Sequence, residues 1–452
     1  MNHPLRHTRS TPPTSLAPDT PRAPHSRPTP RRAVLGGAAA AGLAAALSLP
    51  LAAPASAAPR DGAFRFDLPA PTGPHPVGTT HLHLVDHART ERWTEEPNRP
   101  RELMVSVWYP ARAGADAPRA RYVTPGLAAV FDAYGETQLG LPASALNWAD
   151  IGTHATAGPP VAPSARPRPR PVVLYTPGFQ SSRNTDTVVI AELASHGFVV
   201  VSVDHTYEAM AVEFPDGRLH TISPFLTELP DAEMVRAALT TRTADLRFVV
   251  DQVTELARGR NPDAAGRPLP RGLARAVDPH RIGGYGHSIG PSGLFDAMLA
   301  DRRIRAGALQ DGPLVQGGGR PTAAAQAGLR QPFLLMCGMF GESASEPFHH
   351  RGPLAVGLAA LWENSPGWKR DLWSKGAGHL SYTDFMHVLP VLDREFGVRD
   401  EAMGQIGSLD PAGFIATRRA YLTAFFTQHL LRRPRRLLDA PSPRYPYVEF
   451  ID

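Results

Sequence analysis

Three short runs in the chain are almost wholly apolar, and helical patterns lie beside them. The runs are residues 172–176, 198–203 and 333–337, and the first two are separated by a helical pattern over 185–196. A strand that is apolar on both faces is typical of a parallel sheet with helices on both sides. The pattern therefore predicts a buried, mostly parallel sheet flanked by helices, the longest of them over 230–257.

Strict alternation appears earlier in the chain, at residues 78–85 and 101–109. This period of two, with a polar and turn-rich stretch between the runs, predicts a β-hairpin. His81 and His83 lie two positions apart and would face the same side of the first strand. We interpret them as part of a solvated strand face, because no third metal ligand follows at a telling spacing.

The run 286–290, Gly-His-Ser-Ile-Gly, follows an apolar strand at 281–285 and precedes a helical pattern at 291–299. A Gly-x-Ser-x-Gly turn between a strand and a helix is a nucleophile elbow, in which the serine sits in a strained conformation and the glycines make room. The sequence therefore predicts that Ser288 is a nucleophile.

A serine nucleophile needs a base, and the base needs a carboxylate that orients it. In folds with this elbow the three residues follow one another in the order Ser, acid, His. Asp311 directly follows the predicted strand 304–309, and His379 lies in a loop of small residues after the last strand, so we expect them to be the acid and the base. Other candidates for these two roles are His349, His350, Asp384 and His387. We expect His287 to point away from the pocket, and Asp278 precedes the elbow strand and cannot reach its far end.

Attack by the serine also creates an oxyanion that needs two preorganised donors. We expect one to be the backbone N–H of Ile289, which follows the nucleophile at the start of a helix. The other is expected from the loop after the strand 172–176, where Gly178 allows close approach, and our choice is the N–H of Phe179.

The order of these elements is that of an α/β-hydrolase fold, with a mostly parallel central sheet flanked by helices. The stretches 120–157 and 207–230 interrupt this order, and we expect them to be lid-like insertions near a pocket. A last helical pattern covers 411–431.

The first 57 residues have the composition of a targeting segment. Arg31 and Arg32 precede a weakly apolar run, and the small-residue site 55–57 follows it, which predicts a twin-arginine signal; a membrane anchor is the alternative. We expect 58–74 to be flexible and 75–452 to be a single domain outside the cytoplasm. The only cysteine, Cys337, excludes an internal disulfide, and the scattered basic residues behind a net charge of +5 indicate no nucleic-acid partner.

Several segments together resemble the plasma-type (isoform II) platelet-activating factor acetylhydrolase family of α/β-hydrolases. They are residues 175–182, the entry 192–205 containing Leu-Ala-Ser-His-Gly-Phe, the elbow 286–290, and the stretches 308–311 and 378–379. Carried over by position, the resemblance implies Ser288 as nucleophile, Asp311 as acid and His379 as base, in agreement with the order above. The chain departs from the family pattern at Pro177, where a histidine is usual, and at Pro291, where a glycine is usual.

These observations predict a secreted serine ester hydrolase that forms an acyl-enzyme and uses no metal or organic cofactor. The resemblance implies short-acyl or phospholipid-like esters as substrates, and a transient contact with a lipid surface is compatible with them. The expected partner of the precursor is the twin-arginine export machinery. Two alternatives stay open: a cutinase-like polyester hydrolase, and a binding protein that kept the fold without activity.

Overall fold

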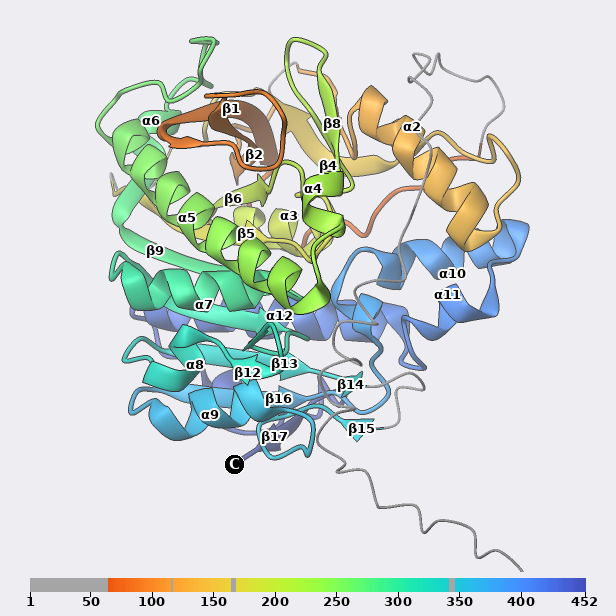
Figure 1. Ribbon diagram of the computed structural model, residues 1–452, viewed down its shortest axis with the longest axis vertical. Helices are drawn as coiled ribbons and strands as arrows, with labels where there is room; N and C mark the ends of the chain where they lie inside the picture. Colours follow the sequence, from red (N-terminus) through yellow and green to blue (C-terminus); the bar gives the residue numbers. More distant parts are fainter. Residues whose placement is uncertain (1–63, 115–116, 164–167, 341–345) are drawn as a thin grey trace, which may run out of the picture.

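The computed structural model describes residues 64–114, 117–163, 168–340 and 346–452, so the predicted targeting segment 1–57 lies outside the described residues. An eleven-stranded sheet crosses the molecule in the order β17-β16-β13-β10-β9-β5-β6-β2-β1-β4-β3 (Figure 1). The contiguous strands from β16 to β6 are parallel to one another, and β2 and β17 join them antiparallel on either side.

The strands of this sheet have the following bounds: β1 Val77–Thr90, β2 Pro100–Pro110, β3 Arg119–Arg121, β4 Gly152–Ala157, β5 Arg170–Thr176, β6 Val199–Asp204, β9 Val277–His287, β10 Ile304–Gln310, β13 Phe333–Cys337, β16 Lys369–Trp373 and β17 Glu449–Ile451. Among the described residues, three two-stranded sheets lie outside it: β7 Ala211–Glu213 with β8 Leu219–Thr221, β11 Val315–Gln316 with β12 Arg320–Pro321, and β14 Met339–Phe340 with β15 Glu346–Pro347.

Helices cover both faces of the sheet. One face carries α5 Asp231–Ala257, α6 Leu273–Ala276, α7 Gly290–Ala300, α8 Ala323–Ala327 and α9 Val356–Asn364, with the α5–α9 stack nearest the viewer in Figure 1. The other face carries α3 Thr187–Ser195, α10 Phe385–Phe396 and α12 Pro411–Leu431. The remaining helical segments are α2 Pro125–Tyr134, α4 Pro224–Thr227, α11 Asp400–Gly404, and the turns η1 Gly135–Leu139, η2 Trp148–Asp150, η3 His379–Tyr382 and η4 Arg436–Leu438.

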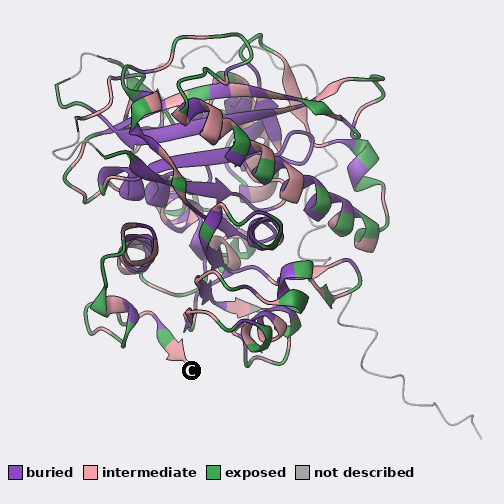
Figure 2. Cartoon of the chain, turned by 90° about the vertical axis from the view of Figure 1, so that its left-hand side faces the viewer, coloured by how far each residue is buried: buried purple, intermediate pink, exposed green. Residues whose placement is uncertain are grey.

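Strand β5 shows why the predicted strands are apolar at every position. Val173 and Tyr175 pack into the cluster that contains α3 and α12, whereas Val172 and Leu174 pack into the cluster that contains α5 and α7. Both faces of the strand are therefore buried, as the continuous purple of the central strands shows (Figure 2). The hydrophobic effect on both faces requires apolar residues in an unbroken run.

The predicted elements agree closely with the structure. The alternating runs form the antiparallel pair β1 and β2, and the terminal helix has the predicted bounds 411–431. Most other boundaries differ by one to four residues. No helix in the described part of the chain is long and apolar enough to cross a membrane.

The structure describes residues 64–74 of the segment 58–74 that we expected to be flexible, and this part contacts the helices of one face. Leu68 is buried, and the carbonyl oxygens of Pro69 and Ala70 accept hydrogen bonds from Arg419 on α12. Thr72 donates its backbone N–H to Glu192 on α3 at 2.8 Å. These contacts place residues 64–74 along the helices of one face.

Candidate active site

Ser288 stands at a turn between β9 and α7 whose backbone is unusual. Its φ of 60° lies in the left-handed region, which residues with a side chain rarely adopt. A Cβ on Gly286 would lie 2.7 Å from the carbonyl oxygen of Thr176 on β5, and a Cβ on Gly290 would be closer still. The two glycines therefore let the elbow press against β5, which holds Ser288 at the carboxyl edge of the sheet.

Asp311 and His379 meet at the same edge. Asp311 follows β10, the neighbour of β9, and its Oδ2 accepts a hydrogen bond of 2.6 Å from Nδ1 of His379. The other carboxylate oxygen accepts the backbone N–H of Gly338 at 3.0 Å. With Nδ1 occupied as a donor, Nε2 of His379 carries the free lone pair that a general base needs.

The loop before His379 is shaped by its small residues. Gly376 has a φ of +87°, and a Cβ on Gly378 would collide with the carbonyl oxygen of Gln405. Ser381 accepts the N–H of Gly378 at 3.0 Å and donates to the carbonyl of Ile406 at 2.6 Å. The close approach of α11 and the following turn therefore fixes the backbone that presents His379.

His287 packs directly on His379. The two ring centroids are 4.4 Å apart, and Nε2 of His287 lies 2.9 Å from the carbonyl oxygen of His379, to which it donates. Burial, reinforced by the neighbouring His379, holds the pKa of His287 well below its usual value. His287 is therefore a neutral support beside His379 rather than a second base, and the contact places His379 next to the elbow.

The two backbone donors predicted for an oxyanion flank Ser288. Ile289 follows it at the start of α7, and a Cβ on Gly178 would lie 3.2 Å from Cβ of Ser288, so the loop that carries Phe179 borders the serine. Pro291 falls in the first turn of α7, where a missing N–H leaves no helical hydrogen bond unmade. This departure from the family pattern is thus accommodated by the helix.

Asp384, a competing candidate for the acid, is used elsewhere. Its two oxygens accept the backbone N–H groups of Thr187 and Val188 at 2.8 and 3.0 Å, at the start of α3. Burial, reinforced by nearby Asp186, raises the pKa of Asp384 to about 7. Asp384 caps a helix, and its hydrogen bonds do not include His379.

The other candidates also have different partners. His350 Nδ1 pairs with Asp371 at 2.7 Å, His349 packs on Trp373, and Asp278 pairs with Arg281 near the start of β9, at the opposite end from Ser288. His387 Nε2 contacts the carbonyl oxygen of Asp67 at 3.1 Å.

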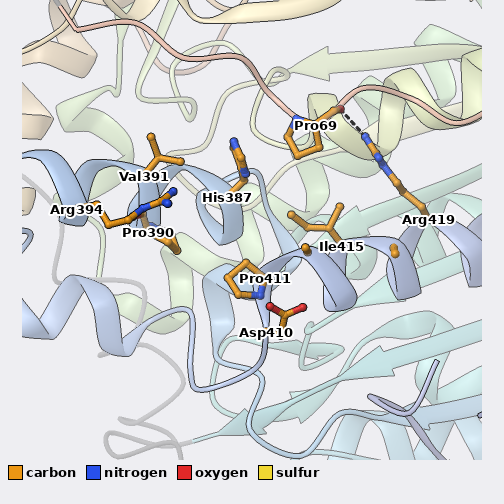
Figure 3. Close-up of a pocket in the computed structure, with 11 residues that line it drawn as sticks. Pro69, His387, Pro390, Val391, Arg394, Asp410, Pro411, Ile415 and Arg419 are labelled. Carbon is orange, nitrogen blue, oxygen red and sulfur yellow. Dashed lines mark hydrogen bonds between the residues drawn. The ribbon is translucent and has the colours of Figure 1, made fainter. Parts of the chain in front are cut away.

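A cavity of about 610 Å³ lies beside His387, between α10, α12 and Pro69 (Figure 3). It is lined mostly by apolar atoms, and Arg419 crosses one side to donate to the carbonyl oxygen of Pro69 at 2.7 Å. None of the residues predicted for catalysis lines this cavity.

The histidine pair on β1 has separate partners, His81 with Ser106 at 2.8 Å and His83 with Glu102 at 3.0 Å. Within the described ranges no group of three or more His, Cys, Asp or Glu side chains is placed to hold a metal ion. Cys337 is fully buried, which raises the pKa of its thiol well above the usual value.

Three polar residues below the loop 176–179 were not singled out by the sequence analysis: His205, Arg242 and Asp245. All three are buried, and Arg242 and Asp245 lie three positions apart on the face of α5 that also carries Leu239 and Leu246. Charged residues on the apolar stripe of a helix are unusual, because a buried charge needs a partner. Their position on this stripe is the sequence signal that could have identified Arg242 and Asp245.

Comparisons with known proteins point to the same chemistry. A family model described as platelet-activating factor acetylhydrolase, isoform II, matches residues 63–224. A probable 1-alkyl-2-acetylglycerophosphocholine esterase of Arthroderma benhamiae is 26% identical over 424 residues, which cover 86% of this chain and 94% of that protein. The solved structure of a ferulic acid esterase from Streptomyces cinnamoneus superimposes with a TM-score of 0.66 at 34% identity, covering 85% of this chain and 99% of that one.

The fold and the family resemblance predicted from the sequence are thereby confirmed. The solved relative is similar over nearly its whole length, and the family model covers the segment that carries β1 to β8. The chain belongs to the platelet-activating factor acetylhydrolase isoform II family of α/β-hydrolases and is a carboxylic-ester hydrolase.

Proposed function

We propose that the ester hydrolase activity runs through Ser288, His379 and Asp311, with the N–H groups of Phe179 and Ile289 as the oxyanion hole. The observation that carries this proposal is the convergence of three separate segments on one sheet edge: the strained Ser288, and the Asp311–His379 hydrogen bond of 2.6 Å beside it. The 4.4 Å contact between the rings of His287 and His379 supports it, because His287 is the residue next to Ser288 in the chain.

The reaction then follows from the roles of these atoms. Nε2 of His379 takes the proton of Ser288 as Oγ attacks the ester carbonyl, and the carbonyl oxygen becomes an oxyanion that the two N–H groups stabilise. The C–O bond to the alcohol breaks, and His379 returns the proton to the leaving oxygen. Water, deprotonated by His379, attacks the acyl-enzyme, and collapse of the second oxyanion releases the acid and restores Ser288.

The proposed nucleophile and the proposed base differ in their exposure to solvent. Ser288 is only 7% exposed, whereas the side chain of His379 is 38% exposed. Water is therefore largely excluded from the nucleophile but can reach the base. Asp311 is buried, so its attraction to an imidazolium is weakly screened.

The substrate class we propose is short-acyl or phospholipid-like esters, as the family membership suggests. Activity on p-nitrophenyl esters of increasing acyl length tests this: we expect kcat/KM to be highest for acetate to butyrate and to fall for decanoate. A 2-acetyl ether phospholipid should compete with the acetate ester. Preference for decanoate or longer acyl chains would contradict the proposed substrate class without affecting the triad.

A second candidate substrate is a hydroxycinnamoyl ester. The ferulic acid esterase is the more similar of the two named relatives in identity, and Phe179 packs against an aromatic and apolar cluster formed by Trp93, Tyr207, Leu226, Met234 and Ala237. Part of this cluster comes from the predicted insertion 207–230. Methyl ferulate hydrolysed with a higher kcat/KM than p-nitrophenyl acetate would favour this candidate.

We also propose that the protein is exported through the twin-arginine route. The proposal rests on Arg31, Arg32 and the run that follows them, all of which lie outside the described residues.

A further inference from the structure

A single buried guanidinium holds the loop that carries Phe179. Arg242, on α5, donates from Nη1 to the carbonyl oxygen of Pro177 at 2.5 Å and from Nη2 to that of Gly178 at 3.0 Å. The same side chain lies 3.3 Å from Oγ1 of Thr176. One planar group therefore contacts three consecutive residues of the turn between β5 and the loop.

The contacts of Arg242 with the loop also determine the direction of the N–H of Phe179, because the peptide bond is planar. In a planar trans peptide the C=O of one residue and the N–H of the next point in opposite directions. Because the carbonyl of Gly178 faces Arg242, the N–H of Phe179 faces away from Arg242. The carbonyl of Gly178 is doubly held, since Ser181 also donates its N–H to it at 3.2 Å.

Arg242 is itself fixed and neutralised. Its Nε donates to Oε1 of Glu208 at 2.6 Å, and both side chains are about 1 to 2% exposed. A rigid fork of this kind loses little further conformational entropy when it binds a loop. A buried, paired guanidinium can therefore act as a fixed template for backbone carbonyls.

A second set of buried, hydrogen-bonded side chains contacts Thr176, where the same loop begins. Nε2 of His205 contacts Oγ1 of Thr176 at 3.0 Å, and Nδ1 contacts Oδ2 of Asp245 at 2.9 Å. Arg101 on β2 in turn donates hydrogen bonds of 2.7 and 3.1 Å to the carboxylate of Asp245. Burial opposes ionisation of Asp245, but Arg101 and the hydrogen bond from His205 outweigh it and hold the pKa well below its usual range. Helix α5 thus anchors the loop at two points.

We propose that Arg242 is the positioning residue of the oxyanion hole, holding the Gly178–Phe179 peptide so that its N–H points at the developing oxyanion. The inference rests on the proposed function, in which that N–H is one of the two donors. Arg242 does not touch the substrate and acts only through the loop. Its loss should therefore weaken binding of the oxyanion more than binding of the uncharged ester.

The test compares Arg242→Met and Arg242→Lys with Arg419→Met, a matched control. Arg419 is also buried and also donates to backbone carbonyls, those of Pro69, Ala70 and Val188, but it lies away from the loop. The measurements are kcat and KM for p-nitrophenyl acetate, and the inhibition constants of an alkyl trifluoromethyl ketone and of the corresponding alcohol. The ketone forms an oxyanion with the serine, and the alcohol does not.

We expect Arg242→Met to lower kcat about 10- to 100-fold, because a small misplacement of a reacting group has effects of this size and complete loss of a donor costs about 10²- to 10³-fold. KM should change less than about threefold, and the ketone should bind more weakly by a factor similar to the loss in kcat, with the alcohol unaffected. Arg242→Lys should recover part of the loss, because an ammonium can bond one of the two carbonyls. Arg419→Met should leave kcat and both inhibition constants near those of the wild type.

The outcomes separate this inference from the function on which it rests. Unchanged kcat and ketone binding in folded Arg242→Met, with Ser288→Ala inactive, would overturn the role of Arg242 and leave the nucleophile in place. Equal weakening of ketone and alcohol would mean a general collapse of the site and would also overturn it. Should Arg242→Met fail to fold, the same comparison in Arg242→Lys decides. An active Ser288→Ala would instead contradict the proposed function.

Discussion

His379 donates from Nδ1 to Oδ2 of Asp311 over 2.6 Å, although the two residues are 68 positions apart in the chain. Parallel strands make this possible, because β10 ends beside β9 and the loop after β16 returns to the same edge of the sheet. The hydrogen bond fixes which nitrogen of His379 is free. The hydrogen bond supports the proposal that Asp311 is the acid, and kinetics can test that proposal.

Replacing Asp311 with Asn should lower kcat by about 10⁴-fold, as loss of the orienting carboxylate does in comparable triads. Asp384→Asn should lower kcat by less than about tenfold, since Asp384 caps α3 rather than orienting His379. Both purified variants would be assayed with the same ester. The reverse ranking would move the acid to Asp384.

The buried carboxyl of Asp384 should make stability depend on pH. Its pKa in the folded protein is raised to about 7, whereas an unfolded Asp titrates near 4. Between pH 4 and pH 7 the carboxyl of Asp384 is therefore protonated in the folded protein but ionised in the unfolded chain. The contribution of Asp384 to stability is fully present below pH 4 and is lost as the pH rises through about 7.

This dependence is best measured as a difference between wild type and Asp384→Asn, because buried histidines with a lowered pKa, such as His287, contribute pH effects of opposite sign to both proteins. The free energy of unfolding of the wild type, relative to the variant, should fall from pH 4 to pH 8. Urea unfolding at four pH values measures it. A relative stability that rises with pH would contradict the raised pKa.

The elbow glycines give a prediction about packing. Gly290→Ala would place a methyl group against the carbonyl oxygen of Thr176, so we expect loss of activity and a lower melting temperature, with overpacking of this kind costing about 1 to 3 kcal/mol. Gly404→Ala on α11 is the matched control, because a Cβ there meets nothing within 4 Å. The two melting curves should differ, and a wild-type curve with full activity for Gly290→Ala would show that the elbow has room to shift.

Much of the fold could be predicted because single strands carry their own signal. The unbroken apolar runs at β5, β6 and β13 reflect burial on both faces. Ser288 and Asp311 each directly follow a predicted strand, and His379 lies in the loop after β16. Local patterns were enough to predict these strands and to choose these three candidate residues.

The supporting residues could not be predicted in the same way. Arg242 and Asp245 read as polar positions on an amphipathic helix, and only the fold places them under a loop about 65 residues earlier in the chain. The contacts of residues 64–74 with Arg419 span some 350 positions and leave no local pattern. Long-range hydrogen bonds to backbone groups have no signature in a single sequence.

The export proposal predicts that changing Arg31 and Arg32 to lysine traps a folded precursor in the cytoplasm. The run behind the two arginines is only weakly apolar and suits the route for folded proteins. Fractionation of cells with an antibody to the protein measures the distribution. Normal secretion of the double variant would indicate a general signal instead.

The central claim is that Ser288 carries the acyl group. The most direct measurement combines kcat of Ser288→Ala with intact-protein mass spectrometry after treatment with a fluorophosphonate that labels serine nucleophiles. We predict a single added phosphonyl group, mapped to Ser288 in the wild type and absent from the variant, together with a loss of about 10⁴- to 10⁶-fold in kcat. A folded Ser288→Ala protein that keeps wild-type activity, or a label mapped to another residue, would contradict the account.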